Sequence, residues 1–240
     1  DEGTGTEVED STVNDNNGTI TNATWTSGKI GNALTFDGSS TGVNTGNGAI
    51  LNDANAMSIS SWINVNSGAA DLGTIAMQWT GYNLAYRTDG GSNDYFWFEL
   101  RGTDASTRDI TSSNGYYNIS EETWHHVVAT YDGADMRIFM DGVLMKEENV
   151  GAFTITDDAS PLRIGEHTDS GSRYFDGEID EVMIFDANLS ATDINKLYHA
   201  GVRKFGLSRA TASGGTYTPV NGLFDDFTDN SIDTSKWTVV

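Results

Sequence analysis

The stretch that decides the fold is Tyr95-Phe96-Trp97-Phe98-Glu99-Leu100-Arg101. Successive side chains of a β-strand point to opposite faces of the sheet, so Phe96, Phe98 and Leu100 share one face. The other four residues share the opposite face. The first face is predicted to lie in the core. The second is predicted to be half open, with two aromatic rings and an ion pair between Glu99 and Arg101.

The same period of two recurs along the chain between clusters of Gly, Asn and Asp. In residues 57–65, Met57, Ile59, Ile63 and Val65 fall on one face, and Asp141-Gly142 joins two further runs as a hairpin turn. Many short strands at this spacing predict a sandwich or barrel, and the absence of long helical patterns excludes an α/β fold. The predicted strands are 33–37, 42–45, 56–65, 73–79, 82–87, 94–101, 106–111, 123–131, 135–140, 142–149, 161–165 and 173–186. Residues 1–32 are polar and rich in turn signals.

One helix is predicted near residue 190. Ser190 caps its start with support from Asp193, and Ile194, Leu197 and Tyr198 form its apolar stripe. Gly201 is predicted to end the helix in a left-handed conformation. The residues that follow have the composition of a linker.

Charge and composition exclude several functions. The 240 residues carry 35 Asp and Glu against 13 Lys and Arg, a net charge of -22. Nucleic acid is excluded as a partner because binding it needs a basic stripe. No stretch approaches the ~20 apolar residues of a membrane span. The chain has no Cys, which excludes disulfides, thiol catalysis and Cys-ligated zinc. The excess of carboxylates suggests that a hard cation holds the Gly-rich loops.

Six segments carry a family likeness in a fixed order: 31–38, 58–63, 124–133, 139–144, 175–185 and 189–194. Among them are Trp124-His125-His126-Val127-Val128 and Phe175-Asp176-Gly177-Glu178-Ile179-Asp180. The sequence resembles a laminin-G-like jelly-roll domain of the concanavalin A-like lectin/glucanase superfamily. The resemblance implies an all-β, two-sheet antiparallel jelly-roll β-sandwich with one short C-terminal helix. It also implies a module of a secreted or surface protein that carries a structural calcium and binds glycans or proteins.

The resemblance departs from the family at both ends. Family members open with an aromatic strand that is missing ahead of Asp1, and residues 223–237 resemble the first strand of another concanavalin A-like domain. We therefore expect a domain at 1–201, a linker at 202–223, and the start of a further domain or a strand-exchange tail at 224–240. A missing strand leaves an unpaired edge that favours self-association, unless the edge stays solvated.

The resemblance also implies the calcium ligands. It places Asp180 as a side-chain ligand, helped by Asp10 or Asp37 and by carbonyls near Gly38. Calcium takes six to eight oxygen ligands, which acidic loops supply. The alternative is that these Asp residues form turns by bonding their own backbone.

The half-open face of residues 95–101 is the candidate ligand-binding surface. Aromatic rings stack on sugars while charged and amide groups bind hydroxyls, and Tyr95, Trp97, Glu99 and Arg101 have this composition. Neighbouring strands extend it with Trp79, Tyr82 and Arg87. The alternative is that this face is covered core. Trp62 and Trp124 are predicted to anchor the fold.

N-glycosylation acceptor tripeptides begin at Asn17, Asn22, Asn118 and Asn188, and they support an extracellular or cell-surface location. Catalysis is not expected, because the Glu-x-Asp-x-Glu strand of glucanases, a nucleophile elbow and a phosphate-binding loop are all absent. The adjacent His125 and His126 face opposite sides of a strand and so cannot form a metal face.

The predicted function is therefore a non-catalytic, calcium-stabilised extracellular module for adhesion or for recognition of a glycan or surface protein. One alternative is a structural subunit of a surface assembly or filament joined by strand exchange. Another is an ancillary domain of a polysaccharide-degrading enzyme.

Overall fold

The computed structural model describes residues 2–12, 14–46, 51, 54–69, 72–88, 94–112, 119–156, 160–167 and 173–204. The chain divides into two units, Asp1–Gly206 and Leu207–Val240, and the described residues all belong to the first. Most of the predicted linker at 202–223 and the whole predicted strand at 224–240 lie outside the described residues.

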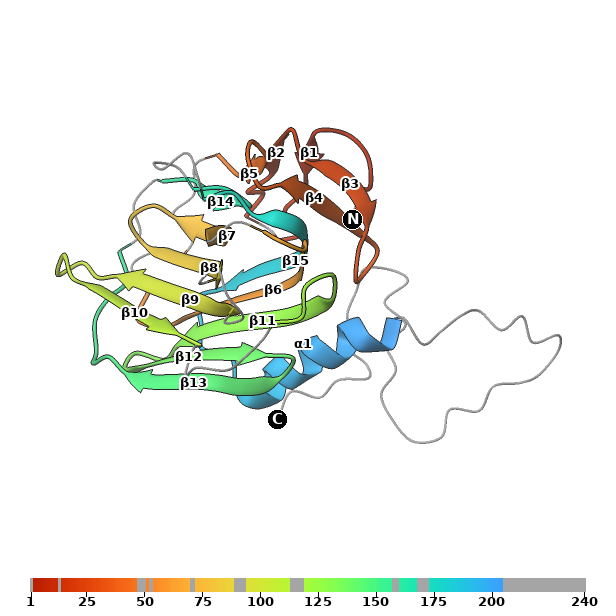
Figure 1. Ribbon diagram of the computed structural model, residues 1–240. Helices are drawn as coiled ribbons and strands as arrows, with labels where there is room; N and C mark the ends of the chain where they lie inside the picture. Colours follow the sequence, from red (N-terminus) through yellow and green to blue (C-terminus); the bar gives the residue numbers. More distant parts are fainter. Residues whose placement is uncertain are drawn as a thin grey trace, which may run out of the picture. The chain divides into compact units, whose positions relative to one another are not determined.

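Two antiparallel sheets form the body (Figure 1). The eight-stranded sheet has the order β1 (Glu7–Val8), β2 (Gly18–Thr21), β5 (Gly42–Asn44), β14 (Leu162–Ile164), β7 (Leu72–Gln78), β8 (Tyr82–Thr88), β9 (Asp94–Arg101) and β10 (Thr107–Thr111). The seven-stranded sheet has the order β13 (Val143–Asn149), β12 (Asp135–Met140), β11 (Trp124–Tyr131), β6 (Met57–Val65), β15 (Asp176–Phe185), β4 (Asn32–Asp37) and β3 (Thr24–Ser27). The predicted all-β sandwich is confirmed, and each predicted strand is present to within three residues at its ends.

Three strands near the N-terminus were missed by the sequence analysis. They are β1, β2 and β3, in a region predicted only to be turn-rich. Ile20 lies between two threonines in β2 and is buried, and Trp25 lies between two threonines in β3 and packs on the core. This alternation of Thr with a large apolar residue was the available signal, but Asn and Asp clusters on both sides concealed it.

The core lies between the sheets and follows the alternation predicted for β9. Phe96, Phe98 and Leu100 are at most 1% exposed, while their neighbours along the strand are half-buried. The same face of β8 contributes Tyr82 and Leu84, which lie opposite Leu100 and Phe98. The hairpin predicted at Asp141-Gly142 joins β12 to β13. Both of its residues have positive φ, at 51° and 80°, as a two-residue type I′ turn requires.

A helix, α1 (Ala191–Lys204), packs on the outer face of the seven-stranded sheet (Figure 1). Its predicted cap is confirmed, since the Asp193 amide donates to Ser190 Oγ at 3.2 Å and Ser190 Oγ donates to Asp193 Oδ2 at 2.6 Å. Ile194 is fully buried against Val128 and Phe139.

The prediction that Gly201 ends the helix was wrong, because α1 continues to Lys204. Gly201 lies against the ring of Trp62, where an added Cβ would be only 2.4 Å from Cζ2. Glycine at this position therefore permits close approach of the helix to the sheet. Trp62 is 2% exposed, as expected of an anchor, but it lies beneath α1 and not between the sheets, and Trp124 is half-buried.

Candidate functional site

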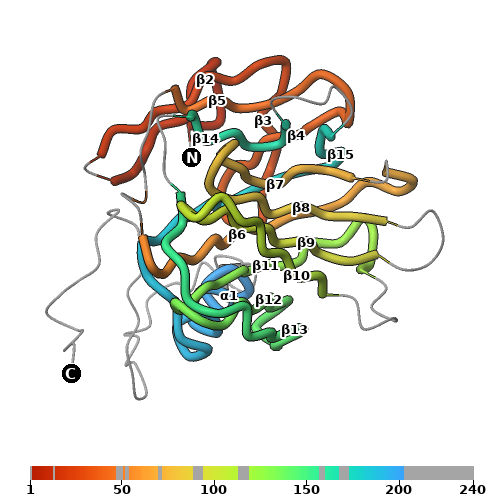
Figure 2. Tube along the Cα trace, turned by 90° about the vertical axis from the view of Figure 1, so that its left-hand side faces the viewer, coloured from red at the N-terminus to blue at the C-terminus, as the bar shows by residue number. Residues whose placement is uncertain are grey.

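The outer face of the eight-stranded sheet carries the candidate site, on the strands that run side by side in Figure 2. Strand pairing places Arg87 opposite Tyr95 across β8 and β9, and Asp109 opposite Glu99 across β9 and β10. Residues directly opposite one another on antiparallel strands have neighbouring side chains. We call this surface the aromatic face and define it as Trp79, Arg87, Tyr95, Trp97, Glu99, Arg101 and Asp109.

One half of the aromatic face is built around Trp97. Its Nε1 donates a hydrogen bond to Asp109 Oδ2 at 3.2 Å, which fixes the indole on the strand surface. The guanidinium carbon of Arg87 lies 5.8 Å from the ring centroids of both Tyr95 and Trp97. These distances are within the ~6 Å range of cation–π attraction. Trp97 therefore has a cation on one side and a carboxylate on the other.

The other half is built around Arg101. The predicted ion pair is present, with Arg101 Nε 3.1 Å from Glu99 Oε1. The guanidinium carbon also lies 5.0 Å from the ring centroid of Trp79, which makes an edge contact with His167 at 5.5 Å. Trp79, which directly follows β7, therefore extends the surface beyond β9, as the sequence analysis expected.

Tyr82 does not belong to this surface, which corrects its assignment as a ligand-binding residue. It is 2% exposed and lies in the core, opposite Leu100 of β9. In β8, Tyr82, Leu84 and Tyr86 point inward, so Asn83, Ala85 and Arg87 point outward. Alternation alone does not tell which of these two sets faces the core. The pairing with β9 places Tyr82 on the core face.

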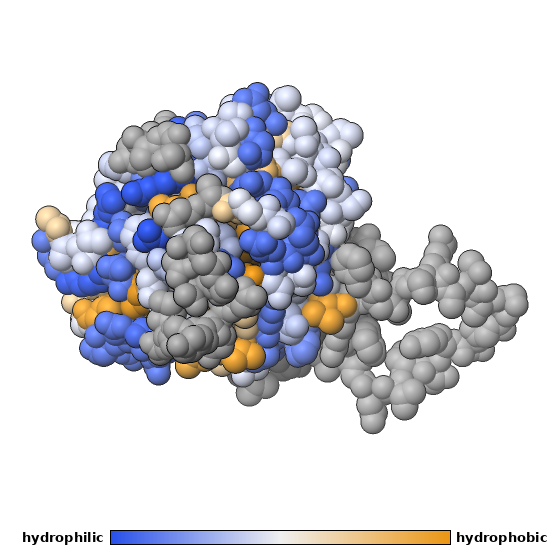
Figure 3. All heavy atoms as spheres, viewed as in Figure 1, coloured by the Kyte–Doolittle hydropathy of each residue, from blue (hydrophilic) through white to orange (hydrophobic). Residues whose placement is uncertain are grey.

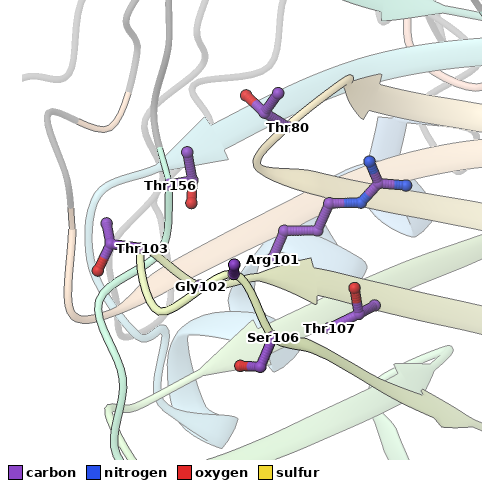
Figure 4. Close-up of a pocket in the computed structure, with 8 residues that line it drawn as sticks. Thr80, Arg101, Gly102, Thr103, Ser106, Thr107 and Thr156 are labelled. Carbon is purple, nitrogen blue, oxygen red and sulfur yellow. The ribbon is translucent and has the colours of Figure 1, made fainter.

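A hydroxyl-rich hollow adjoins the Arg101 end of the aromatic face, with a volume of about 430 Å³. Figure 4 shows its side chains arranged around Gly102 at the end of β9, with Arg101 extending away from that glycine. The hollow was not predicted, because its walls come from segments far apart in the sequence. The residues that line it are Thr80, Arg101, Gly102, Thr103, Ala105, Ser106, Thr107 and Thr156.

The four residues predicted to bind calcium are not all brought together: Asp10 and Asp180 line one groove, and Asp37 and Gly38 do not. Asp10 accepts bonds from the amides of Thr12 and Asn16, both at 2.9 Å, and Asp180 Oδ2 accepts one from the Ile30 amide at 2.8 Å. Among the described residues, which include all four predicted ligands, no group of three acidic or histidine side chains could hold a metal. The contacts of Asp10 match the alternative reading, in which an aspartate bonds its own local backbone, whereas Asp180 bonds an amide 150 residues away.

Asp37 follows the same pattern. Desolvation raises its pKa, but hydrogen bonds from the amides of Ser40 and Ser39, each 2.8 Å long, hold that pKa well below its ordinary value. Gly38 has a φ of 70° and lies beside Asp176, so it closes the turn that Asp37 stabilises. Asp37 and Gly38 therefore have structural roles in one turn, Asp10 stabilises another, and Asp180 holds the Ile30 amide from strand β15.

The predicted N-glycosylation acceptors are exposed wherever they fall within the described residues. Asn17, Asn22 and Asn188 are all exposed, and Asn118 lies outside the described residues. Much of the surface in Figure 3 is hydrophilic, with apolar atoms in scattered patches. No helix in the described part of the chain has the length and apolar character needed to span a membrane.

A second feature lies at β15. Residues 177–179 pair with both β4 and β6, but residues 183–185 pair only with β6 among the described strands. This part of β15 borders a groove of about 600 Å³ lined by Val182 and Ile184, with Glu2, Glu9 and Asp10 also on its wall. The unpaired edge that the sequence analysis expected from a missing first strand stays a prediction.

The sequence matches, over residues 37–195, a family model described as the Concanavalin A-like lectin/glucanases superfamily. This chain belongs to that superfamily. A search of curated proteins finds no significant match. The laminin-G-like resemblance is thereby confirmed, together with the jelly-roll sandwich that it implied.

Solved structures with the same fold include binding domains. Domain 4 of AbnA, a GH43 extracellular arabinanase from Geobacillus stearothermophilus solved with arabinotriose, has a TM-score of 0.60 and 19% identity, covering 75% of this concanavalin A-like chain and 87% of that one. The binding domain of Paraclostridial Mosquitocidal Protein 1 has a TM-score of 0.63 and 16% identity, covering 80% and 49%. The botulinum neurotoxin serotype G binding domain has a TM-score of 0.63 and 15% identity, covering 80% and 48%. The concanavalin A-like chain thus spans about half of each toxin domain.

Proposed function

We propose that this concanavalin A-like domain is a non-catalytic recognition module that binds a glycan on the aromatic face. The observation that carries the proposal is the fixed, half-exposed ring of Trp97, flanked by Arg87 and Asp109. An aromatic ring offers an apolar surface for the C–H groups of a sugar, and the flanking polar groups bind its hydroxyls. The hollow beside Arg101 adds further hydroxyl groups for a longer chain.

The state of the acidic residues favours binding over catalysis. Glu99 and Asp109 lie opposite one another, but Glu99 is paired with Arg101 and Asp109 accepts the indole N–H of Trp97. A glycosidase needs one protonated and one ionised carboxyl group on either side of the scissile bond. Here each carboxylate already accepts a hydrogen bond or ion pair from a neighbouring side chain, and its remaining lone pairs suit the acceptance of sugar hydroxyl protons.

We also propose that the module works in a secreted or surface-attached protein. A net charge of -22 and the three exposed acceptor asparagines suit a secreted or surface-attached protein. The AbnA domain is one domain of an extracellular arabinanase, and a role as an ancillary domain of a polysaccharide-degrading enzyme fits the same surface of this chain. Calcium stays a prediction from the family resemblance, and no site for it is proposed on residues that already stabilise turns.

Replacing Trp97 with alanine is expected to weaken glycan binding at least about tenfold, equivalent to about 1.4 kcal/mol, because the stacking surface is removed. A glycan array followed by calorimetry on the ligands it identifies measures the effect. Trp25→Ala is the matched control, since Trp25 is also half-buried and its Nε1 donates to the Gly5 carbonyl, but it lies on the other sheet. Equal affinities of wild type and Trp97→Ala would refute the proposal.

The edge of β15 at residues 183–185, which no described strand pairs on the side away from β6, favours a second candidate function, in which copies of the chain are joined by strand addition. An exposed edge offers free N–H and C=O groups to another strand. Under this alternative the chain forms dimers or larger species in light scattering, and Ile184→Lys makes them dissociate. Val143→Lys is the control, because Val143 lies exposed on β13, at the far edge of the same sheet. A mass of 25.9 kDa at every concentration would exclude the assembly.

A further inference from the structure

We propose that the ligand of the aromatic face is a sugar with an isolated carboxylate, of the uronic acid class, and that Arg87 binds that carboxylate. This inference rests on the proposed glycan-binding function and specifies its ligand. The first observation is which acidic side chains each arginine of this chain contacts.

Arg87 is exceptional among the arginines whose side chains are described. In a chain with 35 acidic residues, four others contact carboxylates, and Arg173 contacts the His167 ring at 3.3 Å. Arg87 contacts no carboxylate in the described part of the chain, and its Nε finds no hydrogen-bond acceptor there. The arginine–carboxylate pairs are Arg101–Glu99, Arg108–Asp104, Arg137 with Asp132, Asp135 and Glu147, and Arg163–Glu166.

Arg87 is half-buried on the aromatic face, and its Nε is shielded from solvent. Arg87 packs over the rings of Tyr95 and Trp97, so its guanidinium belongs to the surface on which a sugar would stack. A guanidinium has five N–H donors in a planar fork that matches the two oxygens of a carboxylate. Charge-assisted hydrogen bonds of this kind are roughly twice as strong as those to neutral hydroxyls. A carboxylate is therefore the group that Arg87 would select.

The order of groups along β9 matches the order of groups around a uronic acid ring. Arg87 lies at the Tyr95 end of Trp97, while Glu99 and Asp109 lie at the opposite end. Residues two apart on a strand are about 6.6 Å apart, which is close to the width of a substituted pyranose. With its ring on Trp97 and its carboxylate at Arg87, the sugar would direct the hydroxyls across the ring toward Glu99 and Asp109.

The same surroundings disfavour a densely charged polyanion. Binding of a polysulfated chain depends on many cations acting together. Here Arg101 and Arg163 are already neutralised by Glu99 and Glu166, and the chain as a whole has a net charge of -22. A long row of sulfates would meet this negative field, whereas one carboxylate needs only the local field of Arg87.

An array of uronate-containing oligosaccharides, each printed beside its carboxyl-reduced neutral form, tests the inference. The wild type is expected to bind at least one acidic member about tenfold more tightly than its neutral partner. Arg87→Gln should remove this preference, so that the affinities for the acidic form and its neutral partner become equal. Lys146→Gln, a change of equal charge on β13 of the other sheet, should keep it. Thermal melting of each variant shows that it is folded.

The outcomes separate the inference from the function on which it rests. Equal binding of acidic and neutral members, or a preference that survives Arg87→Gln, overturns the carboxylate assignment and leaves glycan binding in place. Stronger binding of polysulfated chains than of uronates also overturns it. An array on which folded wild type binds no sugar at all overturns both the inference and the proposed function.

Discussion

Gly177→Ala is expected to destabilise the fold more than any other single methyl group added to the described residues. Gly177 is the second residue of β15, paired with Phe36 on one side and Val65 on the other. An added Cβ would be 2.1 Å from the backbone oxygen of Asn64 and 3.1 Å from the amide nitrogen of Asn66. Because the obstacle is backbone, no side-chain rotation can relieve the clash.

The backbone conformation adds to this cost. Gly177 has a φ of 140°, a region that L-amino acids rarely adopt. Strained backbone costs about 1–3 kcal/mol, and forced overpacking costs about 1–3 kcal/mol more. We expect a loss of about 3–5 kcal/mol, which is a large part of the stability of a typical domain. Unfolding in urea, followed by tryptophan fluorescence, measures it.

Gly151→Ala is the matched control for this prediction. Gly151 also has a positive φ, at 77°, but no atom lies within 4 Å of the position of an added Cβ. Its replacement should cost only the backbone strain, about 1 kcal/mol. Equal losses for Gly151→Ala and Gly177→Ala would show that the contact with Asn64 has no energetic weight.

Acidification to pH values between about 6.5 and 4 is expected to destabilise the fold through His126. This side chain is 1% exposed, between the sheet and α1, and its Nε2 lies 2.9 Å from Ser60 Oγ. Its ring is 5.1 Å from Trp62 and 6.2 Å from Tyr198. Burial lowers the pKa of His126 from 6.5 to about 4, and the nearby carboxylate of Asp141 only partly opposes this shift.

The sign of the pH effect follows from these two pKa values. Between them the unfolded chain binds a proton at this histidine and the folded chain does not, so falling pH favours unfolding. Stability is complete above about pH 6.5 and decreases as the pH falls toward 4, with a total loss of about 3 kcal/mol. Asp141 has a lowered pKa of its own, and its contribution is lost only below about pH 4, outside this window.

Urea unfolding at pH 7.5 and at pH 4.5 measures this effect. His126→Gln should flatten the pH dependence, because glutamine keeps a polar contact with Ser60 but does not titrate. His199→Gln is the control, since His199 is exposed on α1. If the wild type and His126→Gln lost the same stability over this interval, the buried imidazole would not be its cause.

The sequence predicted the sandwich and the chemistry of its outer face because both depend on alternation within single strands. Phe96 and Trp97 were assigned to opposite faces from their order alone, and the structure bears this out. The phase of a strand such as β8 is a different matter. Alternation places Tyr82 and Arg87 on opposite faces, and only the pairing with β9 shows which of them faces outward.

Features that depend on packing between distant segments could not be predicted. Gly201 has the sequence signature of a helix end, and only the position of Trp62 explains a glycine inside α1. The hollow beside Arg101 combines Thr80 and Thr156 with the β9–β10 turn, which no local pattern brings together. The turn chemistry of Asp10 and Asp37 is local, but the family resemblance directed their interpretation toward a metal.

Because α1 packs on the seven-stranded sheet, the two outer faces of the domain differ. The front is the outer face of the eight-stranded sheet, and the rear is the face that α1 covers. Trp62 and His126 are sealed beneath the helix, so that side contributes rigidity and offers no ligand-sized surface of its own there. Side chains on the front alternate with core residues that face the other way. Natural variation can therefore replace one front residue after another and change the ligand specificity, while the core keeps its stability.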